Sequence, residues 1–258
     1  MDLIYRLVQN VLDIEYKDLS PETVTAAKRV VMDTLGTTIA GSCAQGCSDL
    51  VQLVKDWGGK EESSILVYGG RVSIPNSVLV NCTMAWAWDF DDSYEAGGSH
   101  ASASIVPSCL ALAEYSPRRI SGKEFLLAIS LGIDLQCRLR RSLIPPRVWP
   151  SETFAPFGVV AAAGKLLGFD METMLRGMGI ALIWHGVFLL VSHHLNKRKS
   201  WLMLPIKLCK KELRKLVLAT DYLTSHLQYR KKLKNMGLVL FAILLDMVLE
   251  KICMKSLK

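Results

Sequence analysis

A helical pattern covers residues 20–41, which read SPETVTAAKRVVMDTLGTTIAG. Ser20 can cap the start of a helix with its hydroxyl, and Pro21 suits the first helical position, where its missing N–H would have no partner. Apolar side chains then follow three or four positions apart, at Val24, Ala27, Val31, Leu35 and Ile39. This spacing predicts a helix that buries one face, and Gly41 is expected to end it.

The same kind of signal recurs through the first 181 residues. Further helices are predicted at residues 76–88, 103–115, 122–142, 157–167 and 171–181. Ser121 and Glu124 form a capping box before one of these helices, and Pro145-Pro146 should end it. Residues 64–68, between two glycine pairs, are predicted to form a short strand or an extended loop segment. The small residues at 161–164 should let helices pack closely. The predicted fold class is therefore mainly α.

The charge changes sign near residue 182. Residues 1–182 hold 16 Lys and Arg against 20 Asp and Glu, whereas residues 183–258 hold 15 against 4. The first region thus has a net charge of −4 and the tail one of +11, which together give the net charge of +7. Aromatic residues are sparse among the tail's basic residues, which favours solvated charge over a nucleic-acid surface. We therefore predict two regions, a helical domain at 1–181 and a basic and apolar tail at 182–258, with no nucleic-acid partner.

Residues 177–196 contain no Lys, Arg, Asp or Glu, and the run has the length of a membrane span. Three histidines interrupt it, at His185, His193 and His194. We expect a buried helix or a segment that does not fold here, with membrane association through 177–196 as the alternative. The chain start lacks a signal-peptide pattern, and the seven cysteines follow no metal-binding spacing. Both features predict a cytoplasmic protein with reduced thiols.

The densest polar cluster lies at residues 89–100, which read DFDDSYEAGGSH. Carboxylates beside a histidine and a flexible glycine pair suit a site for proton transfer. Two other interpretations stay open. One is a solvated loop in which an Asp caps the next helix. The other is a Mg²⁺–diphosphate motif, for which a second acidic motif is missing downstream.

Several segments together resemble the MmgE/PrpD family, which includes 2-methylcitrate dehydratase and cis-aconitate decarboxylase. Asp89-Phe90-Asp91-Asp92-Ser93, followed by His100-Ala101-Ser102, is similar to the family's Asp-x-Asp-Asp-Thr loop and His-Pro-Ser segment. Residues 22–36 and 157–181 also match, so the resemblance covers about residues 5–181.

The resemblance implies a helical domain, a homodimer, and a lyase that acts on small di- or tricarboxylates without a metal or organic cofactor. The family's active-site Asp, Thr and His fall on Asp89, Ser93 and His100. A carboxylate base and an imidazole acid suit the elimination of water, so we assign Asp89 and His100 to catalysis, in either order of roles. Ser93, Asp92 and Ser102 are assigned to substrate binding.

The sequence also departs from the family. Ser93 replaces Thr, Ala101 replaces Pro, and Trp149-Pro150-Ser151 stands where many relatives have a His before Pro-Thr. A later Lys-containing segment and the α/β lid domain find no counterpart after residue 181. We therefore expect the tail to be foreign to the fold, through a reading-frame change or a fusion. The alternative function is a catalytically inactive helical remnant that acts only as a binding or structural protein.

Overall fold

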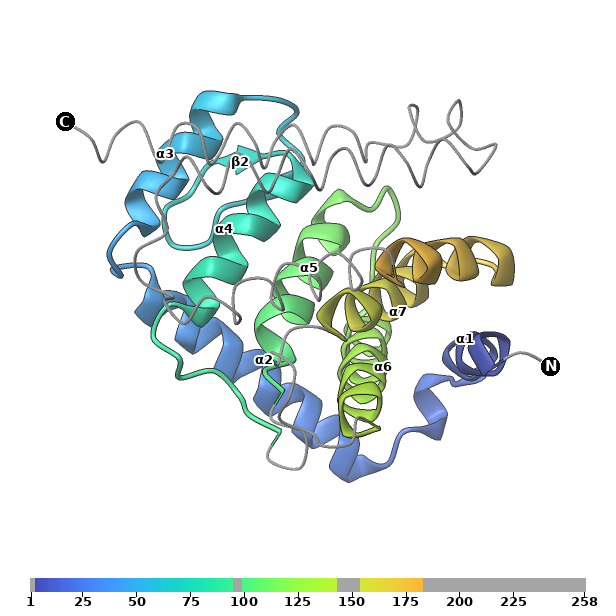
Figure 1. Ribbon diagram of the computed structural model, residues 1–258. Coiled ribbons are helices and arrows are strands. Elements are labelled where there is room, and N and C mark those ends of the chain that lie inside the picture. Colours follow the sequence, from blue (N-terminus) through green and yellow to red (C-terminus); the bar gives the residue numbers. More distant parts are fainter. Residues whose placement is uncertain (1–2, 95–98, 143–153, 183–258) are drawn as a thin grey trace, which may run out of the picture. The chain divides into compact units, whose positions relative to one another are not determined.

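The structure, a computed structural model, describes residues 3–94, 99–142 and 154–182 (Figure 1). These residues are mainly helical, which confirms the predicted fold class. The elements are α1 (Leu3–Asp13), the 3-10 helix η1 (Tyr16–Asp18), α2 (Pro21–Gly41), α3 (Cys47–Trp57), β1 (Ser63–Ser64), β2 (Arg71–Val72), α4 (Ile74–Trp86), α5 (Ser102–Tyr115), α6 (Gly122–Arg141) and α7 (Ala155–Leu167). A further helix covers residues 171–182.

Helix α2 begins where the sequence predicts it, because the Ser20 hydroxyl accepts a hydrogen bond from the Thr23 N–H at 3.2 Å. In the C-terminal half of α2, the buried face differs from the predicted one. Thr34 and Thr38 are buried there, whereas Ile39 is 63% exposed, so the predicted burial of Ile39 is wrong. Both threonine hydroxyls donate to the backbone carbonyl one turn earlier, which satisfies them inside the protein.

Gly41 ends α2 as predicted, but for a different physical reason. It is the last residue of the helix, and it does not adopt a left-handed backbone. A Cβ atom at this position would overlap the backbone carbonyl oxygen of Met84 in α4. Gly41 therefore lets α2 and α4 come close together.

Helices α6 and α7 also meet through small residues. A Cβ atom on either Gly132 or Gly158 would lie 2.7 Å from the carbonyl oxygen of the other. Gly164, in the small-residue segment at 161–164, lies against the side chain of Met174 in the last described helix. The predicted close packing is confirmed.

The apolar core consists of three groups of buried side chains. One joins α1, α6 and α7 and includes Val8, Leu131 and Phe157. A second lies among α5, α6 and α7, around Ile105 and Ile129. The third joins α3 and α4 to the small hairpin. The second group supports the start of α5, directly after the segment that holds the candidate site.

A small hairpin occupies the segment that was predicted as a short strand or an extended loop. Strands β1 and β2 pair antiparallel over two residues each, and residues 65–70 form the turn between them. Gly69 and Gly70 adopt positive φ values of 70° and 83°, which only glycine takes up readily. The turn therefore uses the glycine pair that was expected to follow the strand.

Within the described ranges, the structure holds no helix long and apolar enough to cross a bilayer. Most of the run at 177–196 lies outside the described residues. The same holds for Pro145-Pro146, Trp149-Pro150-Ser151 and the tail from residue 183. The predictions for these segments stay predictions.

Candidate active site

The candidate site lies in the segment between α4 and α5. The indole N–H of Trp88 donates a hydrogen bond of 3.0 Å to the carbonyl oxygen of Ala40, which fastens the start of this segment to α2. Asp89 follows with a left-handed backbone, at a φ of 55°, and its N–H donates to the Trp86 carbonyl at 3.1 Å. Asp tolerates this conformation better than most residues do. These contacts fix the position of the backbone from which the Asp89 side chain projects.

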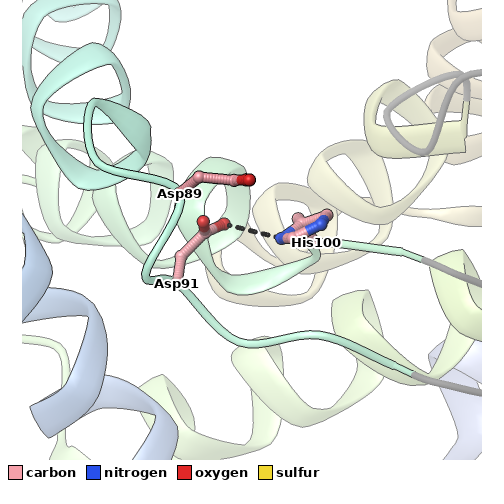
Figure 2. Close-up of side chains that lie close together, drawn as sticks. All are labelled: Asp89, Asp91 and His100. Carbon is pink, nitrogen blue, oxygen red and sulfur yellow. Dashed lines mark ion pairs between the residues drawn. The ribbon is translucent and has the colours of Figure 1, made fainter.

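The His100 ring faces the Asp91 carboxylate (Figure 2). The distance from His100 Nδ1 to Asp91 Oδ2 is 3.4 Å; the Asp91 side chain is fully buried, and the His100 side chain is 23% exposed. Burial raises the pKa of the Asp91 carboxyl, and the neighbouring His100 opposes that shift. A partly exposed imidazole thus lies against a fully buried carboxyl group.

Asp89 completes the cluster. One carboxylate oxygen each from Asp89 and Asp91 and one ring nitrogen of His100 all lie within 4.8 Å of one another. Asp89 is exposed, in contrast to Asp91. The structure therefore brings together the two residues that the sequence assigns to catalysis.

The backbone around His100 is held by α6. Gln136 is fully buried, and its side-chain N–H donates to the Ser99 hydroxyl at 3.0 Å and to the His100 carbonyl at 3.5 Å. The Trp86 ring lies beside the imidazole, with 6.4 Å between the ring centroids. His100 is therefore positioned from two sides by α4 and α6.

Asp92 and Ser102 contact each other. A carboxylate oxygen of Asp92 accepts the Ser102 N–H at 3.0 Å and also accepts the Ser102 hydroxyl. Because Ser102 is the first residue of α5, this carboxylate caps the helix from ten residues upstream. The open alternative of an Asp that caps the next helix is met in part, because Asp92 accepts the N–H of the first residue of α5, whereas the N-cap residue itself is Ala101. The assignment of both residues to substrate binding stays a prediction.

Ser93 lies on the same segment and is exposed, and residues 95–98 lie outside the described residues. A hollow of about 760 Å³ adjoins the segment. It is lined by α2 residues, including Arg29 and Asp33, and by Phe90 and Asp92. Asp89, Asp91 and His100 are not among its lining residues, so the hollow lies beside the cluster rather than over it.

Asp91 is the residue of this site that sequence reasoning did not select. Its signal in the sequence is its position in the Asp-x-Asp pattern, but the left-handed backbone at Asp89 means that this spacing does not place the two side chains alike. Its burial depends on helices from other parts of the chain. The sequence alone therefore could not distinguish Asp91 from its exposed neighbours.

Comparison with known proteins gives two kinds of match. The MmgE/PrpD N-terminal domain matches residues 5–221, which continues 40 residues beyond the predicted boundary at 181. Human cis-aconitate decarboxylase is 29% identical over 174 residues, and the mouse protein of the same name is 27% identical over 179 residues. These alignments cover 64% and 66% of this chain, which spans 36% of the length of each relative. The domain match covers most of the chain and agrees with its helical fold, so the chain belongs to the MmgE/PrpD family through its N-terminal domain.

Proposed function

We propose that the chain carries the acid–base site of a lyase that acts on a small di- or tricarboxylate without a cofactor. The observation that carries the proposal is the cluster in which Asp89 and His100 lie together against the buried Asp91. Family membership supports the reaction class, and the name of the two relatives supports a carboxylate substrate.

The division of roles follows from exposure. A general base must reach the proton that it removes, so the exposed Asp89 is the better base and the fully buried Asp91 the poorer one. His100 keeps its ring partly exposed, so it can deliver a proton. Asp91 then serves to hold the imidazole by Nδ1.

Dehydration of a methylcitrate-like substrate uses both groups. Asp89 takes the proton from the carbon next to a carboxylate, and the electron pair of the broken C–H bond forms the C=C bond. The C–O bond to the hydroxyl breaks, and His100 protonates the departing oxygen, which leaves as water. Each group ends with the opposite protonation state, which proton exchange with solvent resets.

Decarboxylation of an aconitate-like substrate needs one proton. The bond between carbon and carboxylate breaks, CO₂ leaves, and the electron pair that stays on carbon takes a proton from His100. The name of the relatives favours this branch, whereas the sequence resemblance covers both branches. Whether the chain performs dehydration or decarboxylation depends on which substrate its site binds.

Turnover by the purified full chain tests the proposal. Cis-aconitate, 2-methylcitrate and citrate are each supplied in a buffer with EDTA, and the products are followed by NMR. With 2-methylcitrate or citrate, Asp89→Asn and His100→Ala should each lower turnover by about 10²-fold or more, the typical contribution of a general acid or base. With cis-aconitate, the loss is expected in His100→Ala, which removes the proton donor. Asp134→Asn is the matched control, because Asp134 forms an exposed ion pair with Arg138 outside the cluster.

The same assay separates the proposal from the inactive alternative. A lyase should convert at least one substrate and lose that activity in His100→Ala, and in Asp89→Asn as well when the reaction is a dehydration. A chain that folds, as shown by circular dichroism, but converts none of the three substrates contradicts the lyase proposal. That result favours the helical remnant.

A further inference from the structure

Gln136 is a polar residue of α6 whose side chain is fully buried. Its Nε2 atom donates to the Ser99 hydroxyl at 3.0 Å and to the His100 carbonyl at 3.5 Å, whereas its Oε1 atom has no hydrogen-bond partner among the described residues. Burial of an amide costs free energy unless hydrogen bonds compensate it. Both hydrogen bonds that compensate Gln136 go to the two residues that lead into and carry the imidazole.

Helix α7 determines where the Gln136 amide can lie. Only the nitrogen of an amide donates, so the two acceptors fix which way the amide faces. Its oxygen then lies beside Gly158 of α7, where an added Cβ atom would be 3.0 Å from Oε1. A side chain at position 158 would therefore press on the amide, and the absence of one leaves the space that the amide occupies.

Ser99 connects Gln136 to the rest of the site segment. It is fully buried, and its backbone pairs with Tyr94: the Tyr94 N–H donates to the Ser99 carbonyl at 2.8 Å, and the Ser99 N–H donates to the Tyr94 carbonyl at 3.4 Å. His100 follows Ser99 directly. Gln136 thus holds the residue before His100 and the carbonyl directly after the His100 α-carbon.

We infer that Gln136 is a positioning residue for the proton transfer by His100, and that Gly158 provides the space for its amide. The inference rests on the proposed function, in which His100 delivers a proton. A displacement of about 1 Å in a reacting group can lower a rate on the order of 10²-fold, even when the substitution lies outside the site. Because Gln136 is enclosed, it acts through His100 and does not touch the substrate.

The dehydration of 2-methylcitrate by the full chain tests the inference through kcat and KM. Gln136→Met keeps a side chain of similar length and removes the N–H donor, and Ser99→Ala removes the nearer acceptor. Gln136→Met should lower kcat at least about tenfold and change KM less than about twofold, since the substrate contacts stay in place. The double variant should be no slower than Gln136→Met alone, because both substitutions remove the same interaction.

Gly158→Ala tests the space for the amide and should also lower kcat. Gly164→Ala is the matched control on the same helix, because its new methyl group would meet the Met174 side chain instead of Gln136, so its kcat should stay that of the wild type. Circular dichroism establishes that each variant is folded. If Gly158→Ala does not fold, the Gln136 and Ser99 variants still decide. A wild-type kcat in folded Gln136→Met overturns the inference.

NMR of the histidine ring nitrogens separates this inference from the lyase proposal, because it needs no substrate. The His100 resonances are assigned by their loss in His100→Ala, and they should shift in Gln136→Met. Unchanged His100 resonances in folded Gln136→Met overturn the inference, whether or not the wild type has activity. Shifted resonances in a chain whose wild type converts no substrate contradict the lyase proposal alone.

Discussion

Asp89 and Asp91 are two residues apart, and the surrounding helices give them opposite surroundings. Asp91 is enclosed and Asp89 faces outward, so the same side chain suits two tasks. One carboxylate can hold His100, and the other can reach a substrate. At the scale of single residues, burial rather than residue type sets the chemistry of this site.

Gly41 offers a sharp test of packing between α2 and α4. Gly41→Ala should destabilise the protein by about 1–3 kcal/mol, because the new methyl group meets a backbone oxygen that cannot turn aside. Gly36→Ala on the same helix should instead stabilise it by about 0.5–1 kcal/mol, since a Cβ there meets nothing within 4 Å. Urea unfolding of both variants measures the difference. Equal effects of the two substitutions would contradict the close approach at Gly41.

At the scale of elements, features set by neighbouring residues could be predicted from the sequence, whereas features set by packing between distant segments could not. The capping box at Ser121 and Glu124 is formed as predicted, and α6 begins at Gly122, directly after Ser121. Both partners lie within one turn, so the sequence contains the whole interaction. The burial of Thr34 in place of Ile39 depends on neighbouring helices instead, as does the turn at residues 65–70. The sequence therefore located most helices but could not select which faces they bury.

The start of α6 predicts a pH dependence. Hydrogen bonds from the Ser121 N–H and hydroxyl, together with Arg118, lower the pKa of Glu124 from 4.5 to about 2. A lowered pKa means that the ionised carboxylate stabilises the folded state above pH 4.5. This contribution is lost as the pH falls toward 2. In Glu124→Gln, the free energy of unfolding should therefore fall less steeply over this interval.

Solvent screens Glu124, which is exposed, so the change should be modest. Glu172→Gln is the control, because it removes the same charge from an exposed ion pair with Arg176. Urea unfolding at several pH values compares the slopes. If the free energy of unfolding changes with pH as steeply in Glu124→Gln as in the wild type, the capping box does not cause this pH dependence.

At the scale of the whole molecule, the family resemblance predicts a homodimer. Met32, Ile39 and Phe90 are 71%, 63% and 77% exposed, and Met32 and Phe90 both line the hollow beside α2. Exposed apolar groups of this kind often mark an interaction surface. Light scattering after size-exclusion chromatography should give twice the chain mass.

Phe90→Ser should shift this mass toward the monomer, because it removes apolar area from that surface. Tyr115→Ser, which changes a half-exposed aromatic residue at the end of α5, should leave the mass unchanged. A monomer at every concentration would contradict the predicted dimer.

The division of the chain is also a whole-molecule prediction. The change of charge near residue 182 suggested a boundary, whereas the domain match continues to residue 221. A change in composition shows where the character of the sequence changes, but it does not show how far the similarity to a family extends. The helical region through residue 181 could therefore be recognised from sequence, while its C-terminal limit stays a prediction.

The central claim is that Asp89 and His100 together perform proton transfer on a small carboxylate. The most direct measurement is the rate of dehydration of 2-methylcitrate, the reaction that uses both groups, by the full chain, beside Asp89→Asn, His100→Ala and the Asp134→Asn control. The account predicts turnover in the wild type and the control, and a loss of about 10²-fold or more in both site variants. Wild-type rates in either folded site variant would contradict it.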